Sequence, residues 1–421
     1  MLTEASEVSL TRAVTFDEKI LRTVSGIVED VRKSGEEAVK RYVREFDSPA
    51  AADISLIVPK SELESCAKFA DARVLKAVLT AKSNIEKFHI LERERSFFTA
   101  GADVMLGQSI VPLDRVAVYV PGGKAFYPST LLMTVIPAMI AGVPDITIVT
   151  PPDRNGAVRE EICYLAQLLG AARIVKAGGA QGIAYAAFGG KDLVPVDKIV
   201  GPGNVYVTLA KKLVYGYCAV DMLAGPSEIM IIADDSADAG CIARDLISQA
   251  EHDEDASSIL VTTSRELIRA VNEKLPAYVS ASKRRAIAEA SIQKNGKSIL
   301  VESLERAFAA ANKYGPEHLE VITRLSDAEV IGSVKNAGAL FLGENTPEAL
   351  GDYLIGTNHV LPTWGASRFS SPLGVYDFYR RVNVIRASKR YITTAGEDVI
   401  ALAEYEGLSA HADAVRERQS R

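Results

Sequence analysis

Histidine is scarce in this sequence, and four of its five histidines lie in short polar clusters of the C-terminal half. The clusters are Gln249–His252, Glu317–His318, Gly351–His359 and Glu406–His411. Imidazoles beside carboxylates are the groups that bind zinc and transfer protons near neutral pH. The clustering therefore predicts a metal site or an acid–base site.

Groups that could hold one metal ion occur in three of these clusters. Gln249 and His252 are three residues apart at the end of an apolar helical pattern, so they share a helical face. An imidazole is a standard zinc ligand and an amide oxygen is an unusual one, whereas polar residues that end a helix are usually only solvated. Asp352 could add a carboxylate and His411 a second imidazole, which completes a set of four ligands without cysteine. Each of these residues alone is more often a loop or surface residue, so only their joint occurrence favours a metal.

Glu317 and His318 place a carboxylate next to an imidazole, the two groups most often used for proton transfer. The simpler interpretation is a hydrogen-bonded structural pair. Adjacent side chains point apart in a regular strand or helix. Both can serve one site only if Gly315 and Pro316 form an irregular turn in front of them.

Size and composition exclude several classes of protein. A chain of 421 residues with 48% hydrophobic residues can bury two or three cores. The net charge of -6 comes without a basic stripe, so nucleic acid is not an expected partner. The apolar stretch 131–149 contains two prolines and an aspartate, so no membrane span is expected. The cysteines are dispersed and the N-terminus lacks a secretory signal, which favours a reducing cytoplasm or a plastid-like compartment.

Hydrophobic periodicity predicts an α/β protein. Residues 17–46 have helical spacing, and a capping box of Ser34 with Glu37 divides them into two helices. Short β-branched runs then alternate with helical segments, which predicts parallel sheets covered on both faces. The expected strands are 116–119, 146–149, 173–175, 198–200 and 229–232, followed after a break by 259–261, 298–301 and 339–342. The last fifty residues lose this alternation and predict a small helical appendage.

Three glycine-rich turns, at residues 119–123, 177–181 and 201–204, follow expected strands in the middle of the chain. Such turns near helix N-termini bind phosphorylated ligands in α/β proteins, although ordinary tight turns explain them almost as well. No G-x-G-x-x-G motif is present, so the usual dinucleotide fingerprint is missing.

Taken together, several motifs resemble the histidinol dehydrogenase family. The similarity extends in order from about Gly107 to His411, and more loosely over the helical start. Members of this family oxidise L-histidinol to L-histidine in two NAD-linked, zinc-dependent steps that end histidine biosynthesis. The motifs that carry the resemblance are residues 116–123, 201–204, 221–228, 249–252, 351–353 and 358–362.

The resemblance also implies roles for individual residues. His318 would be the general base for both oxidations, and Glu317 would activate the water that hydrates the aldehyde. The zinc, which orients the substrate, would be held by Gln249, His252, Asp352 and His411. Contacts to NAD are implied for Tyr119, Gln181 and Asn204. Contacts to the substrate are implied for Ser227, Gln249, His252, His318, Asp352, Glu406 and His411, with His359 or its loop beside them.

The family's fold implies two parallel-sheet domains of incomplete Rossmann-like character, with small terminal helical segments. Residues 1–15 would form an N-terminal segment. Residues 16–118 and 229–370 would form the domain that carries the zinc and the acid–base pair. Residues 119–228 would form the NAD-contacting domain, and residues 371–421 would be exchanged between the subunits of a homodimer. Glu406 and His411 would then complete the site of the partner subunit.

Other functions remain open from the residues alone. A related enzyme could oxidise another amino alcohol or polyol, such as a sulfonated diol, although the carboxylate of Glu406 suits an ammonium group better. A zinc hydrolase could use Glu317 to activate water without a nicotinamide cofactor. A catalytically silent binding protein is the third alternative.

Overall fold

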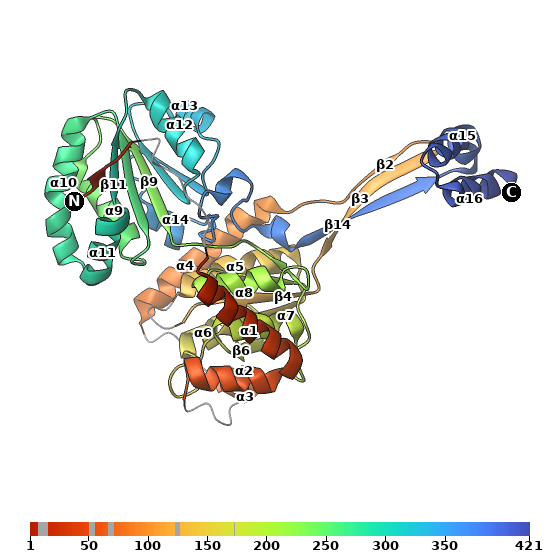
Figure 1. The fold of residues 1–421 in the computed structure, drawn as a ribbon, viewed down its shortest axis with the longest axis horizontal. Helices are drawn as coiled ribbons and strands as arrows, with labels where there is room; N and C mark the ends of the chain where they lie inside the picture. Colours follow the sequence, from red (N-terminus) through yellow and green to blue (C-terminus); the bar gives the residue numbers. More distant parts are fainter. Residues whose placement is uncertain (7–15, 50–54, 66–70, 123–126, 172) are drawn as a thin grey trace.

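The computed structural model of the chain describes residues 1–6, 16–49, 55–65, 71–122, 127–171 and 173–421. Most of the expected N-terminal segment (residues 7–15) and Gly123 of the first glycine-rich turn lie outside the described residues. Two α/β lobes form the body, and a long arm extends from it (Figure 1). Each lobe has its own parallel sheet, which confirms the fold class expected from the sequence.

The first lobe, here called the five-stranded lobe, contains a parallel sheet in the order β6-β5-β4-β7-β8. Alternate residues of the central strand face opposite sides: Val116 and Val118 belong to one core, whereas Ala117 and Tyr119 belong to the other. Both faces are buried, as parallel sheets require. The strands are β4 (Arg115–Tyr119), β5 (Asp145–Thr150), β6 (Arg173–Lys176), β7 (Lys198–Val200) and β8 (Ala219–Val220).

Helices cover both faces of this sheet. On one face lie α1 (Glu18–Ser34), α2 (Glu36–Tyr42), the π-helical turn η2 (Val43–Asp47), α7 (Gly179–Phe188) and α8 (Val205–Val214). On the other lie α4 (Ala72–His89), α5 (Pro128–Ala141) and α6 (Glu160–Leu168), with α3 (Lys60–Ser65) against α6 and η3 (Ile90–Glu92) after α4. The helices of residues 18–89 therefore pack on β4–β8, which corrects the expected grouping of residues 16–118 with residues 229–370. An amphipathic pattern predicts that a helix face is buried, but it does not specify the sheet that buries it.

The division between α1 and α2 occurs where the sequence predicts it, for a different reason. Gly35 adopts a positive φ of 54°, and its N–H donates to the carbonyl of Val31. No side chain caps α2. The helix therefore stops because Gly35 takes a backbone conformation that other residues resist, and the expected capping box does not form.

The second lobe, here called the six-stranded lobe, contains a parallel sheet in the order β1-β11-β10-β9-β12-β13. The strands are β1 (Thr3–Glu4), β9 (Glu228–Ala233), β10 (Ser257–Thr262), β11 (Lys297–Leu300), β12 (His318–Ile322) and β13 (Ala339–Leu342). One face packs against α9 (Ala239–Ala250), α10 (Arg265–Ala281) and α11 (Arg285–Asn295), and the other against α12 (Leu304–Tyr314) and α13 (Asp327–Ser333). The short helix α14 (Glu348–Tyr353) follows β13.

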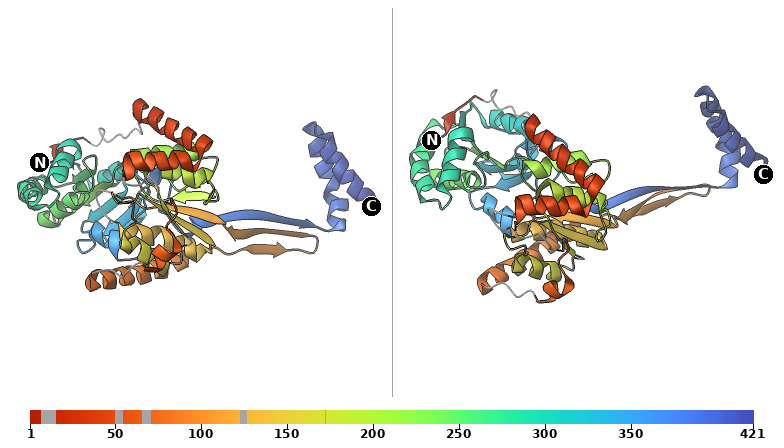
Figure 2. Two further views of the ribbon diagram at one scale, coloured as in Figure 1. Left: turned by 90° about the horizontal axis from the view of Figure 1, so that it is seen from below. Right: turned by 60° about the horizontal axis from the view of Figure 1, so that its bottom comes forward.

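The arm consists of an antiparallel sheet that ends in two helices, and it projects far from both lobes (Figure 2). Its strands are β2 (Phe97–Ala100), β3 (Val104–Pro112) and β14 (Tyr379–Ala387), and its helices are α15 (Lys389–Tyr405) and α16 (Ser409–Ser420). The two helices were expected, but the sheet was not, because an exposed ribbon lacks the apolar runs of a buried strand. The turns η4 (Ala366–Arg368) and η5 (Val375–Phe378) precede the arm, and Phe378 packs in the five-stranded lobe.

Among the described residues, no helix combines the length and the apolarity that crossing a bilayer would require. This agrees with the two prolines and the aspartate in the apolar stretch 131–149. That stretch forms α5, a turn at Gly142 and strand β5.

Candidate active site and metal centre

Three predicted groups come together at the amino ends of β9 and β12 in the six-stranded lobe. His318 begins β12 and is paired with Ile229 in the neighbouring strand β9. Gln249 lies in the last turn of α9, and His252 follows in the turn that leads to β10. Asp352 lies in α14. His252, His318 and Asp352 are distant in sequence, yet their side chains lie close together, and Gln249 is buried three residues before His252.

The turn before β12 has the irregular form that the acid–base pair needs. Gly315 ends α12 with a positive φ of 65°, in the left-handed region. Glu317 then precedes the strand, and its Oε2 lies 3.7 Å from Nδ1 of His318. The two adjacent side chains therefore serve one site.

Glu228, at the start of β9, orients both members of this pair through its main chain. Its N–H donates to Oε2 of Glu317 at 2.8 Å. Its carbonyl oxygen lies 3.2 Å from Nδ1 of His318, so it accepts a hydrogen bond when that nitrogen is protonated. This contact favours the tautomer with its proton on Nδ1, which leaves Nε2 as the proton acceptor.

Nε2 of His318 is the nitrogen that faces the other site residues. It is buried and has no hydrogen-bond partner among the residues that the structure describes, and it lies 3.6 Å from Oδ1 of Asp352. Burial opposes protonation of His318, but the nearby carboxylates of Glu348, Glu317 and Asp352 outweigh it and raise its pKa well above the ordinary value. Burial also raises the pKa of Glu317 to about 8, although His318 opposes this rise. Both groups thus bind protons more tightly than an ordinary histidine or glutamate side chain.

The donor atoms of His252, Glu348 and Asp352 lie within 4.8 Å of one another, close enough to share one cation. Within the described part of the chain, both amide atoms of Gln249 and both carboxylate oxygens of Glu348 are buried without hydrogen-bond partners. Each such group costs about 1–3 kcal/mol unless something compensates it. Burial lowers the pKa of His252, which keeps its imidazole neutral and able to bind a metal. The residues therefore fit a divalent cation such as zinc.

Glu348 was not predicted as a site residue. Its Oε1 lies 3.5 Å from Nδ1 of His318, and it shares a face of α14 with Asp352, four residues later. That spacing was the signal available in the sequence. Its main-chain N–H donates to Oε1 of Glu320 at 2.7 Å, so a buried carboxyl group on β12 anchors the start of α14. Burial raises the pKa of Glu320 and of its neighbour Asp245.

His359 borders the site without facing its centre. Its Nδ1 lies 2.8 Å from the carbonyl oxygen of Asp352, and its Nε2 lies 3.4 Å from Oγ1 of Thr130 on α5. Burial lowers the pKa of His359. The residue therefore supports the backbone that carries Asp352. Ser227, directly before β9, is partly buried at the edge of the site.

The residues expected to contact NAD lie at the carboxyl edge of the five-stranded sheet, where each already has a protein partner. The hydroxyl of Tyr119 accepts a hydrogen bond from Gly179 N–H at 3.0 Å. Gln181 donates to Oδ2 of Asp47 at 3.1 Å. Asn204 caps α8 by accepting from the N–H groups of residues 206 and 207. The chain order reverses between β4 and β7, and such switch points are where open α/β sheets bind ligands.

Glu406 and His411 do not reach this site within their own chain. Glu406 ends α15 and His411 lies in α16, and both are exposed at the far end of the arm (Figure 1). The arm of a single chain therefore does not place these two side chains at the site.

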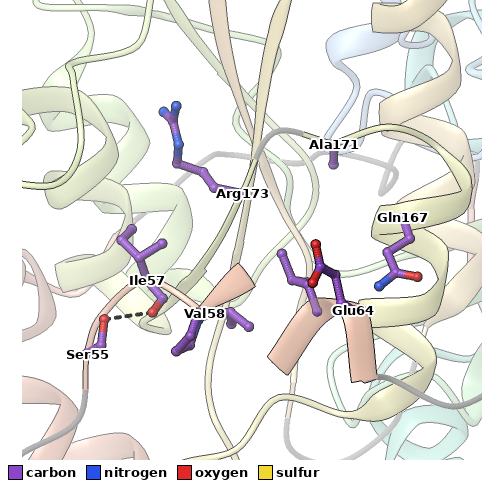
Figure 3. A pocket seen from close by; sticks show the side chains of 9 residues that line it. Ser55, Ile57, Val58, Glu64, Gln167, Ala171 and Arg173 are labelled. Carbon is purple, nitrogen blue, oxygen red and sulfur yellow. Dashed lines mark hydrogen bonds between the residues drawn. The ribbon is translucent and has the colours of Figure 1, made fainter. Parts of the chain in front are cut away.

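A surface pocket of about 750 Å³ lies elsewhere, beside α3, α6 and β6 (Figure 3). Its polar groups include Glu64, Gln167 and Arg173, and the last of these pairs with Asp145 at 3.2 Å. None of the predicted site residues lines it. The chemistry of the buried histidines is therefore not connected to this pocket.

Comparisons with known proteins give a family match over most of the chain. A family model described as Histidinol dehydrogenase matches residues 10–419. The histidinol dehydrogenase of Oceanobacillus iheyensis is 45% identical over 413 residues, covering 98% of this chain and 95% of the relative. That of Aquifex aeolicus is 43% identical over 419 residues, covering 100% and 97%.

Two solved structures also match most of the chain. The crystal structure of histidinol dehydrogenase from Elizabethkingia anophelis matches with a TM-score of 0.91 and 34% identity, covering 98% of this chain and 94% of that one. A putative methylmalonate-semialdehyde dehydrogenase from Sinorhizobium meliloti matches with a TM-score of 0.51 and 15% identity, covering 92% and 91%. At that identity, the second match shows similarity of fold alone.

Proposed function

Since the chain belongs to the histidinol dehydrogenase family and is an oxidoreductase of histidine biosynthesis, we propose that it performs the complete four-electron oxidation of L-histidinol. L-histidinaldehyde would be the intermediate and L-histidine the product. Two NAD molecules would each accept one hydride. The observation that carries this proposal is the buried imidazole of His318, whose Nδ1 faces Glu317 and whose Nε2 faces Asp352 of the group of residues that fits a metal.

The metal would be zinc, held by Gln249, His252 and Asp352 of one chain with His411 of the partner subunit. Bound zinc would supply a Lewis acid that orients the imidazole and amino nitrogens of the substrate. The unpartnered amide of Gln249 and the neutral imidazole of His252 support this ligand set. Ser227, His318 and Glu406 of the partner subunit would complete the contacts to the substrate.

His318 would remove the hydroxyl proton while the first hydride leaves for NAD. The carbon that bears the hydroxyl group releases its hydride readily only when the hydroxyl proton is removed as well, so the base must reach the hydroxyl oxygen directly. Nδ1 is held at the carbonyl of Glu228, which leaves Nε2 free for this proton. His318 would repeat the same task for the second oxidation.

Glu317 would activate the water that converts the aldehyde to its hydrate. Its Oε2 is occupied by Glu228 N–H, which fixes the carboxylate and leaves its second oxygen to accept a proton. The raised pKa of about 8 makes the ionised form a stronger base than an ordinary glutamate. The hydrate would then release the second hydride to a second NAD.

NAD would bind at the carboxyl edge of the five-stranded sheet, in contact with Tyr119, Gln181 and Asn204. Tyr119 is the last residue of β4 and Asn204 follows β7, and these are the two strands at the switch point. The cofactor would therefore belong to one lobe and the metal and acid–base pair to the other. We place the enzyme in the cytoplasm, where this biosynthetic reaction has its reactants.

A homodimer that exchanges its arms would bring Glu406 and His411 to the partner's site. The arm carries many exposed apolar side chains, which a monomer would leave in water. Those at least half exposed are Phe97, Phe98, Leu106, Val382, Ile385, Leu402 and Tyr405. A second copy of the chain is the occupant that covers this surface and also completes the ligand set.

The direct test combines metal analysis of the purified protein with turnover of L-histidinol and NAD. We expect about one zinc per chain and two NADH formed per histidinol consumed. One NADH per histidinol would indicate a simple alcohol dehydrogenase. No NADH would favour the hydrolase or the silent binding protein.

A further inference from the structure

Lys211 on α8 and Asp221 after β8 form an ion pair inside the five-stranded lobe, with side-chain exposures of 2% and 1%. Two charges removed from water carry a large desolvation cost, and apolar residues often fill such a position with equal or greater stability. A structural role in stability alone therefore does not account for the pair. Its position relative to the proposed cofactor site suggests another role.

Both charged groups hold the main chain of one residue, Gly201. The Lys211 ammonium donates to the Gly201 carbonyl at 2.9 Å, and Oδ2 of Asp221 accepts from Gly201 N–H at 2.7 Å. Gly201 has a φ of +111°, and a Cβ on it would lie 2.3 Å from the carbonyl oxygen of Tyr119. The ion pair thus fixes the turn that leads to Asn204 directly against the end of β4.

Asp221 also begins the connection that enters the other lobe. Its Oδ1 accepts from the N–H of Met222 at 2.6 Å, and Thr208 of α8 donates to the Ala224 carbonyl at 2.8 Å. The connection ends at Glu228, whose N–H holds Glu317. One short segment is therefore anchored to the expected NAD turn at its start and to the acid–base pair at its end.

The far end of this connection is held equally firmly. Gly225 N–H donates to Oγ1 of Thr363 at 2.6 Å, and a Cβ on Gly225 would meet the indole ring of Trp364 at 2.1 Å. Trp364 has a φ of 57°, which is rare for a residue other than glycine. The main-chain N–H of Trp364 donates to Oε1 of Glu228 at 3.1 Å. The segment thus has little freedom to shift between the lobes.

We propose that Lys211 and Asp221 are positioning residues that hold the turn of Gly201–Asn204 in register with Glu228, so that the nicotinamide cofactor faces the Glu317–His318 pair. The proposal rests on the proposed function, because it assigns the cofactor to this turn. Neither residue touches the reacting atoms. They would act on the distance between the nicotinamide cofactor and the reacting atoms of the substrate. Hydride transfer is sensitive to this distance, because a misplacement of about 1 Å can lower the rate about a hundredfold.

The test compares Lys211→Met and Asp221→Asn with wild type by two measurements. The first is the dissociation constant of NADH, from a fluorescence titration without histidinol. The second is kcat and KM for NAD and for histidinol. We expect weaker NADH binding by about tenfold and a lower kcat, with zinc content and KM for histidinol unchanged.

Controls separate positioning from stability. Lys211→Arg keeps the charge and should recover most of the NADH affinity. Lys294→Met removes the exposed Lys294–Asp255 pair and should change neither constant. If Lys211→Met does not fold, the neutral double variant Lys211→Met/Asp221→Asn, which buries no unpaired charge, replaces it.

A lower melting temperature with wild-type NADH affinity and kcat would overturn the positioning role. Turnover of histidinol by the wild-type enzyme tests the proposed function separately. If wild type binds NADH but does not oxidise histidinol, the proposed function fails, while the ratio of dissociation constants still decides the role of the pair.

Discussion

The main-chain N–H of Glu228 donates a 2.8 Å hydrogen bond to Oε2 of Glu317. This bond joins Glu228, the first residue of β9, to Glu317, which directly precedes the neighbouring strand β12. The N–H of Glu228 contacts Oε2 of Glu317 and leaves Oε1 of that buried carboxylate without this hydrogen bond. The carbonyl oxygen of the same Glu228 lies 3.2 Å from Nδ1 of His318. The main-chain N–H and C=O of Glu228 thus orient Glu317 and His318, the two potential bases. Substitution of the Glu228 side chain would not remove these main-chain groups.

Glu317→Gln should separate the two oxidations. The amide cannot accept a proton, so aldehyde hydration should slow by about a hundredfold or more, while oxidation of the alcohol continues. Single-turnover assays started from histidinol and from histidinaldehyde measure the two steps. Glu305→Gln, on an exposed part of α12, is the matched control. Loss of zinc from Glu317→Gln would show that this carboxylate is a ligand instead of a base.

His318→Asn should slow both oxidations, because each step needs the same proton acceptor. The expected loss is about 10²- to 10⁴-fold in kcat, the usual contribution of a general base. Zinc content and NADH affinity should stay at wild-type values. A variant that retained rapid oxidation of either substrate would exclude His318 as the shared base.

Glu317 should also make the metal-free fold less stable as the pH rises. Burial raises its pKa from 4.5 to about 8, so the native state keeps a proton that the unfolded chain loses. This contribution to stability is complete below pH 4.5 and is lost as the pH rises through about 8. Urea unfolding of chelator-treated protein between pH 5 and about 8.5 measures it, and Glu317→Gln should show a flatter dependence. Equal slopes for the two proteins would contradict the assignment.

Gln249→Ala should weaken zinc binding. The buried amide has no hydrogen-bond partner among the described residues, so its loss would remove the proposed ligand without breaking another hydrogen bond. We expect the zinc dissociation constant to rise by at least about tenfold, since the loss of an outer-shell partner already has that effect. Gln167→Ala in the separate surface pocket is the control. Unchanged metal affinity would remove Gln249 from the ligand set.

Two inactive variants should complement each other if the arms are exchanged. In a mixed dimer, the His411→Ala chain supplies a body with an intact base. The His318→Asn chain supplies the intact arm that this body receives. Random association gives half of the dimers one complete site, so co-expression should restore about a quarter of wild-type activity. An arm that served its own body would give no recovery.

Several properties followed from local sequence alone. The alternation of apolar β-branched runs with helical segments predicted parallel sheets, because burial on both faces imposes that composition on each strand. The histidine clusters and their neighbouring carboxylates predicted roles for Gln249, His252, His318 and Asp352, and the last three lie close together in the structure. Their chemistry is a property of residue type, which the sequence states directly.

The tertiary structure decided what depends on partners distant in the chain. Sequence patterns could not assign residues 18–89 to the five-stranded lobe, because a buried helix face does not identify the sheet beneath it. They also missed Glu348, whose role arises only when α14 approaches β12. The exposed arm separates His411 from its expected site, and that separation has no local signature. The type of each side chain can be read from the sequence, whereas the residues that surround it depend on packing between segments that are distant in the chain.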